Sequence, residues 1–312
     1  MSVTPHTSKS IRLQRRCGNG WRALVFLVTL ATLIGTLAAQ AGRRAHPSSE
    51  ASSLLNVTAR RADGSTAPIA SKDISFFDNG VEQSIRNFSL DPSPARIVLL
   101  VDNSLTIRAD VEKLEAATLE FAYEIYDGDK LLIVGYDDSA EIVSDWTDNA
   151  KKITAALKGF RKKGEPRLFD ALTAVIEDAL RPLSTQKRTV VVISDGLDRG
   201  SRTKFEDVLS KLQELDITVY AVQAPDRTRG AIRRDVPKPK QVVERLVEGT
   251  GGLVFPIDKP SEAAKTICDE LRKNRYLLSY LPQSVLYSEP RRLLIMGDTG
   301  INVRAKAMQP PE

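Results

Sequence analysis

The sequence predicts an α/β protein with a doubly wound, mainly parallel β-sheet, a small accessory β unit before it and a C-terminal β tail. From residue 95 to residue 274, short and continuously apolar segments alternate with longer segments whose apolar residues recur at helical spacing. Such apolar segments have no solvent-facing side, which is typical of parallel strands covered by helices on both faces. Short β-like segments with Gly-containing turns flank this region.

The expected elements follow in order along the chain. The main sheet takes strands at residues 96–102, 130–136, 140–144, 189–194, 218–223 and 253–256. Helices are expected at residues 111–126, 150–160, 169–180, 203–215, 241–248 and 261–274. The β unit takes strands at 54–59, 74–77 and 85–90, and the tail takes strands at 276–281, 292–296 and 301–305. Because Asp91-Pro92-Ser93-Pro94 breaks the chain, we divide the folded part into residues 52–91, 95–280 and 281–312.

The N-terminus has the layout of a secretory signal. Five basic residues precede the apolar run Ala23–Ala39, and Ala39-Gln40-Ala41 is a small-x-small cleavage pattern. We therefore expect residues 1–41 to be a signal, residues 42–51 to be a flexible linker, and the protein to be exported to the periplasm or secreted. The alternative is an uncleaved membrane anchor at residues 21–39, which would be the protein's only membrane contact.

Composition excludes several classes of function. Outside residues 1–41 the chain has 40 basic and 40 acidic residues, so no excess charge directs it to nucleic acid. Both histidines, His6 and His46, precede the expected folded region, which excludes Ser-His and Cys-His nucleophile systems and a His-ligated zinc site. Because Cys17 lies in the signal, Cys268 has no partner for an intrachain disulfide.

Oxygen-bearing side chains follow two of the expected parallel strands. Asp102 ends the first strand, with Ser104 and Thr106 at alternate positions after it, and Asp195 follows the strand at 189–194. Either carboxylate alone would be a common helix cap or turn residue. Together on one rim of the sheet, the four side chains form an all-oxygen set that suits Mg²⁺ or Mn²⁺.

At these residues the sequence resembles the von Willebrand factor A (vWA) family. In that family an Asp-x-Ser-x-Ser loop, a Thr of a second loop and an Asp of a third loop form a metal-ion-dependent adhesion site, and a carboxylate of the partner completes the metal shell. More narrowly, the chain resembles a bacterial group called VWFA-related at Asp73–Gly80, Thr250–Gly252 and Arg272–Tyr280. The resemblance implies a Rossmann-like vWA fold and a metal site at Asp102, Ser104, Thr106 and Asp195.

The second loop departs from the family pattern. Pro166 stands where the resemblance implies the ligand Thr, and proline has no hydroxyl to offer. A bound Mg²⁺ or Mn²⁺ could keep one more water, or take an oxygen of Glu165. Alternatively, the guanidinium of Arg167 could lie between the two carboxylates and neutralise them without a metal. The sequence leaves both alternatives open.

We therefore expect a binding module and not an enzyme. The first hypothesis is recognition of a protein or peptide through a degenerate metal-ion-dependent adhesion site that captures a partner carboxylate. The second is a vWA scaffold whose metal site has decayed and which engages partners through another face, such as the β unit or the basic run 227–240, expected to be a solvated loop. A remote alternative is an aspartic-type hydrolase using Asp298 of a single Asp-Thr-Gly sequence.

Overall fold

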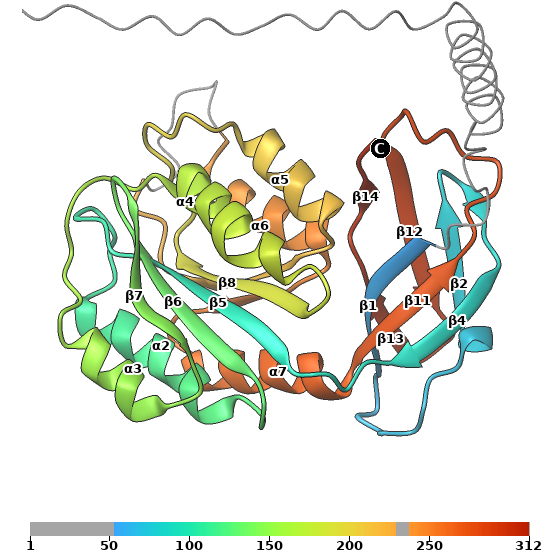
Figure 1. Cartoon of the computed structure of the whole chain (residues 1–312), viewed down its shortest axis with the longest axis horizontal. Coiled ribbons are helices and arrows are strands. Elements are labelled where there is room, and N and C mark those ends of the chain that lie inside the picture. The colour runs from blue at the N-terminus through green and yellow to red at the C-terminus, as the bar shows by residue number, and fades with distance from the viewer. Residues whose placement is uncertain (1–52, 229–236, 312) are drawn as a thin grey trace, which may run out of the picture. The chain divides into compact units, whose positions relative to one another are not determined.

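The computed structural model describes residues 53–228 and 237–311; the expected signal and linker, and part of the basic run, lie outside the described residues. The main sheet has six strands in the order β10-β9-β8-β5-β6-β7 (Figure 1). They are β5 (Ala95–Asp102), β6 (Lys130–Tyr136), β7 (Ala140–Thr147), β8 (Lys187–Ser194), β9 (Thr218–Gln223) and β10 (Val254–Pro256). Only the pairing of β6 with β7 is antiparallel among them. The α/β fold class is confirmed.

Helices cover both faces of this sheet (Figure 1). One face carries α2 (Val111–Glu124), α3 (Ala150–Leu157) and α7 (Pro260–Lys273); the other carries α4 (Leu168–Ala174), α5 (Phe205–Glu214) and α6 (Pro239–Thr250). Alternate residues of β5 explain why: Leu99 packs in the first core, and Leu100 in the second. A strand buried on both sides must be apolar at every position, which is the pattern of the sequence.

The expected helix at 169–180 changes its winding. After α4 the chain continues as a π-helical segment at Val175–Leu180 and a short 3₁₀ turn at Arg181–Leu183. Val175, Ile176 and Leu180 nevertheless remain buried. The apolar residues of this segment therefore pack into the core in the π-helical part as they do in α4.

The remaining strands build a separate β body from both ends of the described chain (Figure 1). Its sheets have the orders β13-β1-β11-β4 and β14-β12-β2-β3. The elements are β1 (Ser53–Arg61), the 3₁₀ turn Ser71–Asp73, β2 (Ile74–Asp78), β3 (Val81–Glu82), β4 (Ile85–Leu90), β11 (Arg275–Tyr280), β12 (Arg291–Gly297), β13 (Ile301–Arg304) and β14 (Met308–Gln309). The N-terminal β unit and the C-terminal tail therefore share one core.

The structure shifts the boundary that we drew after residue 280. Strand β11 pairs with β1 and β4, in the β body, and not with the main sheet. Its residues Leu278 and Tyr280 are buried against Leu55 and Phe76 in the β-body core. The sequence places the strand at 276–281 among those of the tail, and the structure agrees with that grouping, because the alternate apolar residues of β11 lie in the small core.

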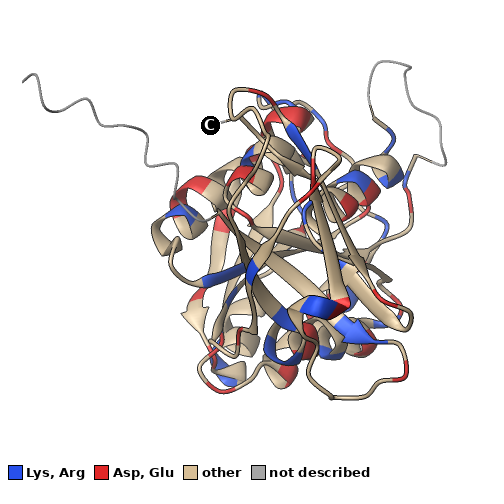
Figure 2. Cartoon of the chain, turned by 90° about the vertical axis from the view of Figure 1, so that its right-hand side faces the viewer, with Lys and Arg blue, Asp and Glu red and all other residues tan. Residues whose placement is uncertain are grey.

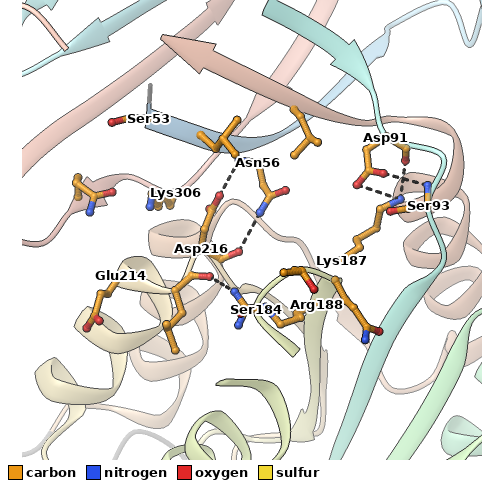
Figure 3. A pocket seen from close by; sticks show the side chains of 16 residues that line it. Ser53, Asn56, Asp91, Ser93, Ser184, Lys187, Arg188, Glu214, Asp216 and Lys306 are labelled. Atoms are coloured by element: carbon orange, nitrogen blue, oxygen red, sulfur yellow. Dashed lines mark hydrogen bonds and ion pairs between the residues drawn. The ribbon is translucent and has the colours of Figure 1, made fainter. Parts of the chain in front are cut away.

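A polar interface joins the β body to the main domain (Figure 3). Asn56 donates its backbone N–H to Asp216 Oδ2 at 2.7 Å and its side-chain amide to the Asp216 carbonyl at 3.1 Å. Lys187 Nζ donates to the carbonyls of Asp91 and Leu271 at 2.6 and 2.7 Å. Asn56, Asp91, Lys187 and Asp216 line a cavity of about 640 Å³. Burial lowers the pKa of Lys187 to about 8, and the charge of the Asp91 carboxylate, 3.6 Å from Nζ, opposes that shift.

Across residues 53–228 and 237–311, no helix combines the length and the apolar character needed to cross a bilayer.

Candidate functional site

The sheet brings the ends of β5 and β8 together. These strands are parallel neighbours, with Val101 opposite Ile193, so the residues that follow them emerge at the same rim. Asp102 and Asp195 are both fully buried there. Ser194 Oγ donates to Asp102 Oδ2 at 3.1 Å, and it accepts from Tyr136 OH at 2.7 Å and from the Gly196 N–H at 3.0 Å. The expected rim is therefore assembled around two carboxylates.

Short hydrogen bonds fix the loops on which the carboxylates lie. Asp102 Oδ1 accepts from Ser104 N at 2.9 Å and from Ser104 Oγ at 2.6 Å, while Asp195 Oδ1 accepts from Leu197 N at 3.0 Å. Gly196 follows with φ at 87°, and a Cβ at this position would lie 2.4 Å from the carbonyl oxygen of Pro239. Only glycine lets this loop pass so close to the start of α6.

The guanidinium of Arg227 lies between the two carboxylates. Nη2 donates to Asp102 Oδ2 at 2.6 Å and to Asp195 Oδ1 at 2.7 Å, and Nε donates to Asp195 Oδ2 at 2.6 Å. Nη1 donates to Ser104 Oγ at 2.9 Å and to Thr106 Oγ1 at 2.5 Å. An arginine side chain has five N–H donors, and here each of them has an acceptor.

Burial and charge act in opposite directions on this arginine. Its side chain is 5% exposed, and burial by itself would lower its pKa. The hydrogen bonds with Asp195 and the charges of Asp102 and Asp195 outweigh burial and raise the pKa of Arg227 above its ordinary value. Burial also raises the pKa of Tyr136, with the charge of Asp102 adding to it. Arg227 thus stays charged and Tyr136 stays neutral.

The structure answers the question left open by Pro166. Pro166 is buried, and its carbonyl accepts a hydrogen bond from the Arg199 N–H at 2.6 Å. Glu165 pairs with Arg199 at 3.1 Å, and Arg167 lies 3.8 Å from Asp138. Neither Glu165 nor Arg167 enters the cluster, so the expectation that Arg167 would lie between the carboxylates is wrong.

Sequence reasoning missed Arg227 because it was assigned to a solvated basic loop. That assignment is wrong for Arg227, while residues 229–236 lie outside the described part of the chain. A signal was present: β9 is the parallel neighbour of β8 and ends at Gln223, so the residues after it also emerge at this rim. A cation shortly after a strand end was as strong a candidate as Arg167.

The residues present do not fit a divalent cation while Arg227 holds this position. The oxygens that would bind Mg²⁺ or Mn²⁺ in Asp102, Ser104, Thr106 and Asp195 already accept hydrogen bonds from the guanidinium. In the described residues there is no group of three or more His, Cys, Asp or Glu side chains that could hold a metal ion. Asp298 lies elsewhere, in the exposed turn between β12 and β13.

The von Willebrand factor type A domain family matches residues 97–197. A solved aerotolerance-related membrane protein from Bacteroides fragilis is 16% identical, over 57% of this chain and 99% of its own, with a TM-score of 0.46. A von Willebrand factor type A protein from Catenulispora acidiphila is 9% identical, over 84% and 75%, with a TM-score of 0.46. Proximal thread matrix protein 1 of the mussel byssus, whose metal-ion-dependent adhesion site (MIDAS) motif is occupied by zinc, is 15% identical. The match covers 62% of this chain and 48% of that protein's chain, with a TM-score of 0.43.

A search of curated protein sequences finds no match. The family match spans β5 to β8 and therefore includes both strand ends that carry the buried carboxylates. Residues 97–197 of this chain are therefore similar to the von Willebrand factor type A domain family.

Proposed function

We propose that this chain is an exported binding module whose vWA domain recognises a protein or peptide at the rim of the sheet. The observation that carries the proposal is the setting of Leu105. It lies between Ser104 and Thr106, which both accept hydrogen bonds from Arg227, and its backbone N–H donates to the Gly164 carbonyl at 3.1 Å. Its side chain is nevertheless 65% exposed. An exposed apolar side chain on an anchored backbone, surrounded by polar groups, gives a partner an apolar centre to bury.

Charged pairs surround this apolar side chain on the neighbouring loop. Glu165 pairs with Arg199, Lys163 pairs with Glu141 at 2.8 Å, and all four side chains are substantially exposed. Such a rim gives specificity and excludes water around an apolar centre. A partner with an apolar side chain and complementary charges fits this surface.

The cluster beneath Leu105 does not support carboxylate capture. Two carboxylates and one guanidinium leave a net negative charge, and each N–H of the Arg227 side chain already has an acceptor. An approaching partner carboxylate would be repelled and would find no donor. Of the two hypotheses from the sequence, the structure supports a scaffold that binds without a metal, with the contact placed beside the cluster.

Several observations support binding over catalysis. Ser194 is fully buried with three hydrogen-bond partners, and Cys268 is buried with its pKa raised by burial. Both are therefore poor nucleophiles. Acidic and basic residues are interspersed along the chain in the view of Figure 2.

Photo-crosslinking in cells tests the proposed contact, with a matched control in the same domain. Leu105 is 65% exposed, and Tyr123 on α2 is 67% exposed. A photoreactive residue at 105 is expected to give a discrete adduct, and the same residue at 123 is expected to give none. Leu105→Glu should remove the partner from the co-purified material, and Tyr123→Glu should retain it. Equal crosslinking at both positions, or none at 105, would reject the proposed surface.

A further inference from the structure

We infer that Arg227 is the resident cation of this vWA domain: its guanidinium takes the place of a divalent metal, and the cluster binds Mg²⁺ or Mn²⁺ only when this side chain is removed. The inference concerns the rim used in the proposed function. The test of this inference needs no binding partner. A failure of the inference can therefore be distinguished from a failure of the proposed function.

Arg227 provides the positive charge that pairs with the two buried acidic residues. Asp102 and Asp195 are fully buried and share hydrogen bonds with one group, and a buried pair of acidic side chains calls for a paired positive charge. Within the described residues, the ion pairs of both carboxylates are made by Arg227. The protein therefore supplies internally the positive charge that the oxygen cluster requires.

The guanidinium also fills the space that a metal ion would need. Five oxygens of four residues accept from the guanidinium at 2.5–2.9 Å. A Mg²⁺ or Mn²⁺ ion held by the same oxygens would have to lie at the point on which they converge, because its ligands must approach to about 2.1 Å. That point is filled by the guanidinium. Metal and arginine are thus mutually exclusive in this cluster.

The backbone around Arg227 is anchored by its own hydrogen bonds. Its own backbone N–H donates to Asp195 Oδ2 at 3.2 Å, and the Ala224 N–H donates to the Ser194 carbonyl at 3.0 Å, which ties the end of β9 to β8. On the other side, Thr228 donates its N–H and its hydroxyl to Asp226 Oδ1, each at 2.7 Å. The side chain is delivered by a fixed backbone and is not a surface group folded inward.

The missing hydroxyl of the second loop agrees with this assignment. The guanidinium has already used its five donors on Asp102, Asp195, Ser104 and Thr106. A threonine at the position of Pro166 would have no N–H left to accept. The loop can therefore carry a proline there, and it turns its backbone carbonyl to Arg199.

Manganese titration of the purified chain tests the inference, with Mn²⁺ followed by electron paramagnetic resonance and the melting temperature measured in parallel. The wild type should bind no Mn²⁺ at this cluster, and its melting temperature should not change with Mn²⁺. Arg227→Ala should melt at a lower temperature without metal, bind one Mn²⁺ and regain stability as Mn²⁺ is added. Arg227→Ala combined with Asp102→Asn should lose that binding. Arg181→Ala, which removes an exposed arginine outside the cluster and the proposed rim, should bind no Mn²⁺ and should show no change of melting temperature with Mn²⁺.

Two outcomes would overturn the inference. Saturable Mn²⁺ binding by the wild type that Asp102→Asn abolishes would show that metal and Arg227 are compatible. A folded Arg227→Ala protein that binds no Mn²⁺, and whose melting temperature does not change with Mn²⁺, would show that the oxygens are not a cation site. If Arg227→Ala does not fold, Arg227→Gln keeps a polar side chain with N–H donors but without the charge, and the same two outcomes apply to it.

Discussion

Arg227 grips Asp195 with two parallel hydrogen bonds, Nε to Oδ2 at 2.6 Å and Nη2 to Oδ1 at 2.7 Å. Such a bidentate pair is stronger and more specific in its geometry than a hydrogen bond between neutral groups, because both of its bonds are charge-assisted. Since Asp195 follows β8 and Arg227 follows β9, the pair locks two neighbouring strand ends together. A guanidinium thereby performs the structural task of joining the rim loops.

Loss of this arginine should be strongly destabilising. Arg227→Ala leaves two buried carboxylates without a counter-charge, and removing one partner of a buried pair costs about 3–5 kcal/mol. Arg199→Ala breaks only the exposed pair with Glu165 and should cost at most about 1 kcal/mol. Urea unfolding of both variants and the wild type measures the difference. Equal small losses for both would show that the buried cluster does not hold the rim.

Stability should rise with pH in the alkaline range because of Lys187. Burial lowers the pKa of Lys187 to about 8, whereas a lysine in the unfolded chain titrates near 10.5. Between these values the unfolded state binds more protons, so the free energy of unfolding increases with pH; below about 8 both states hold the proton and the contribution is constant. The wild type minus Lys187→Met difference, from urea unfolding, isolates this contribution. A difference that stays flat or falls above pH 8 would contradict the burial.

The two ends of the described chain should be inseparable in the β body. Phe76 is 1% exposed in a core that also contains Leu278 and Leu293, so Phe76→Ala should cost about 3–5 kcal/mol.

The connection at Asp91–Pro94 should resist proteolysis, because Lys187 and Arg272 donate to the carbonyls of Asp91 and Pro92. Limited proteolysis followed by mass spectrometry checks this. Release of a folded fragment ending near Pro94 would argue against a shared core.

Export makes its own prediction at the N-terminus. Fractionation should find the protein outside the cytoplasm, and N-terminal sequencing should begin at Gly42 if residues 1–41 are cleaved. An intact N-terminus in the membrane fraction would instead support the anchor at residues 21–39. A cytoplasmic protein with an intact N-terminus would reject both.

The sequence allowed the layers of the fold to be predicted because burial dictates its pattern. The strands at Ile85–Leu90, Lys130–Tyr136 and Thr218–Gln223 have the bounds expected from the sequence. Helix α3 ends at Leu157 and not at Phe160, since periodicity does not mark where the last turn opens. Likewise, the place of β11 depended on which of two cores needed its apolar face.

The site was predictable only as far as residues are tied to strand ends. Asp102 ends β5 and Asp195 directly follows β8, so the parallel sheet alone brings them to one rim. Arg227 comes four residues after the end of β9, and the path of a loop over that length has no periodic signal in the sequence. The buried charge of the two carboxylates required a cation, but charge balance did not say which arginine would provide it.

The most direct measurement of the central claim is a crystal structure of the wild-type chain grown with MnCl₂, with anomalous scattering recorded at the manganese edge. We predict no anomalous peak at the cluster and a guanidinium of Arg227 within hydrogen-bonding distance of Asp102, Asp195, Ser104 and Thr106. A peak between Asp102 and Asp195, with the Arg227 side chain turned out of the cluster, would contradict the account.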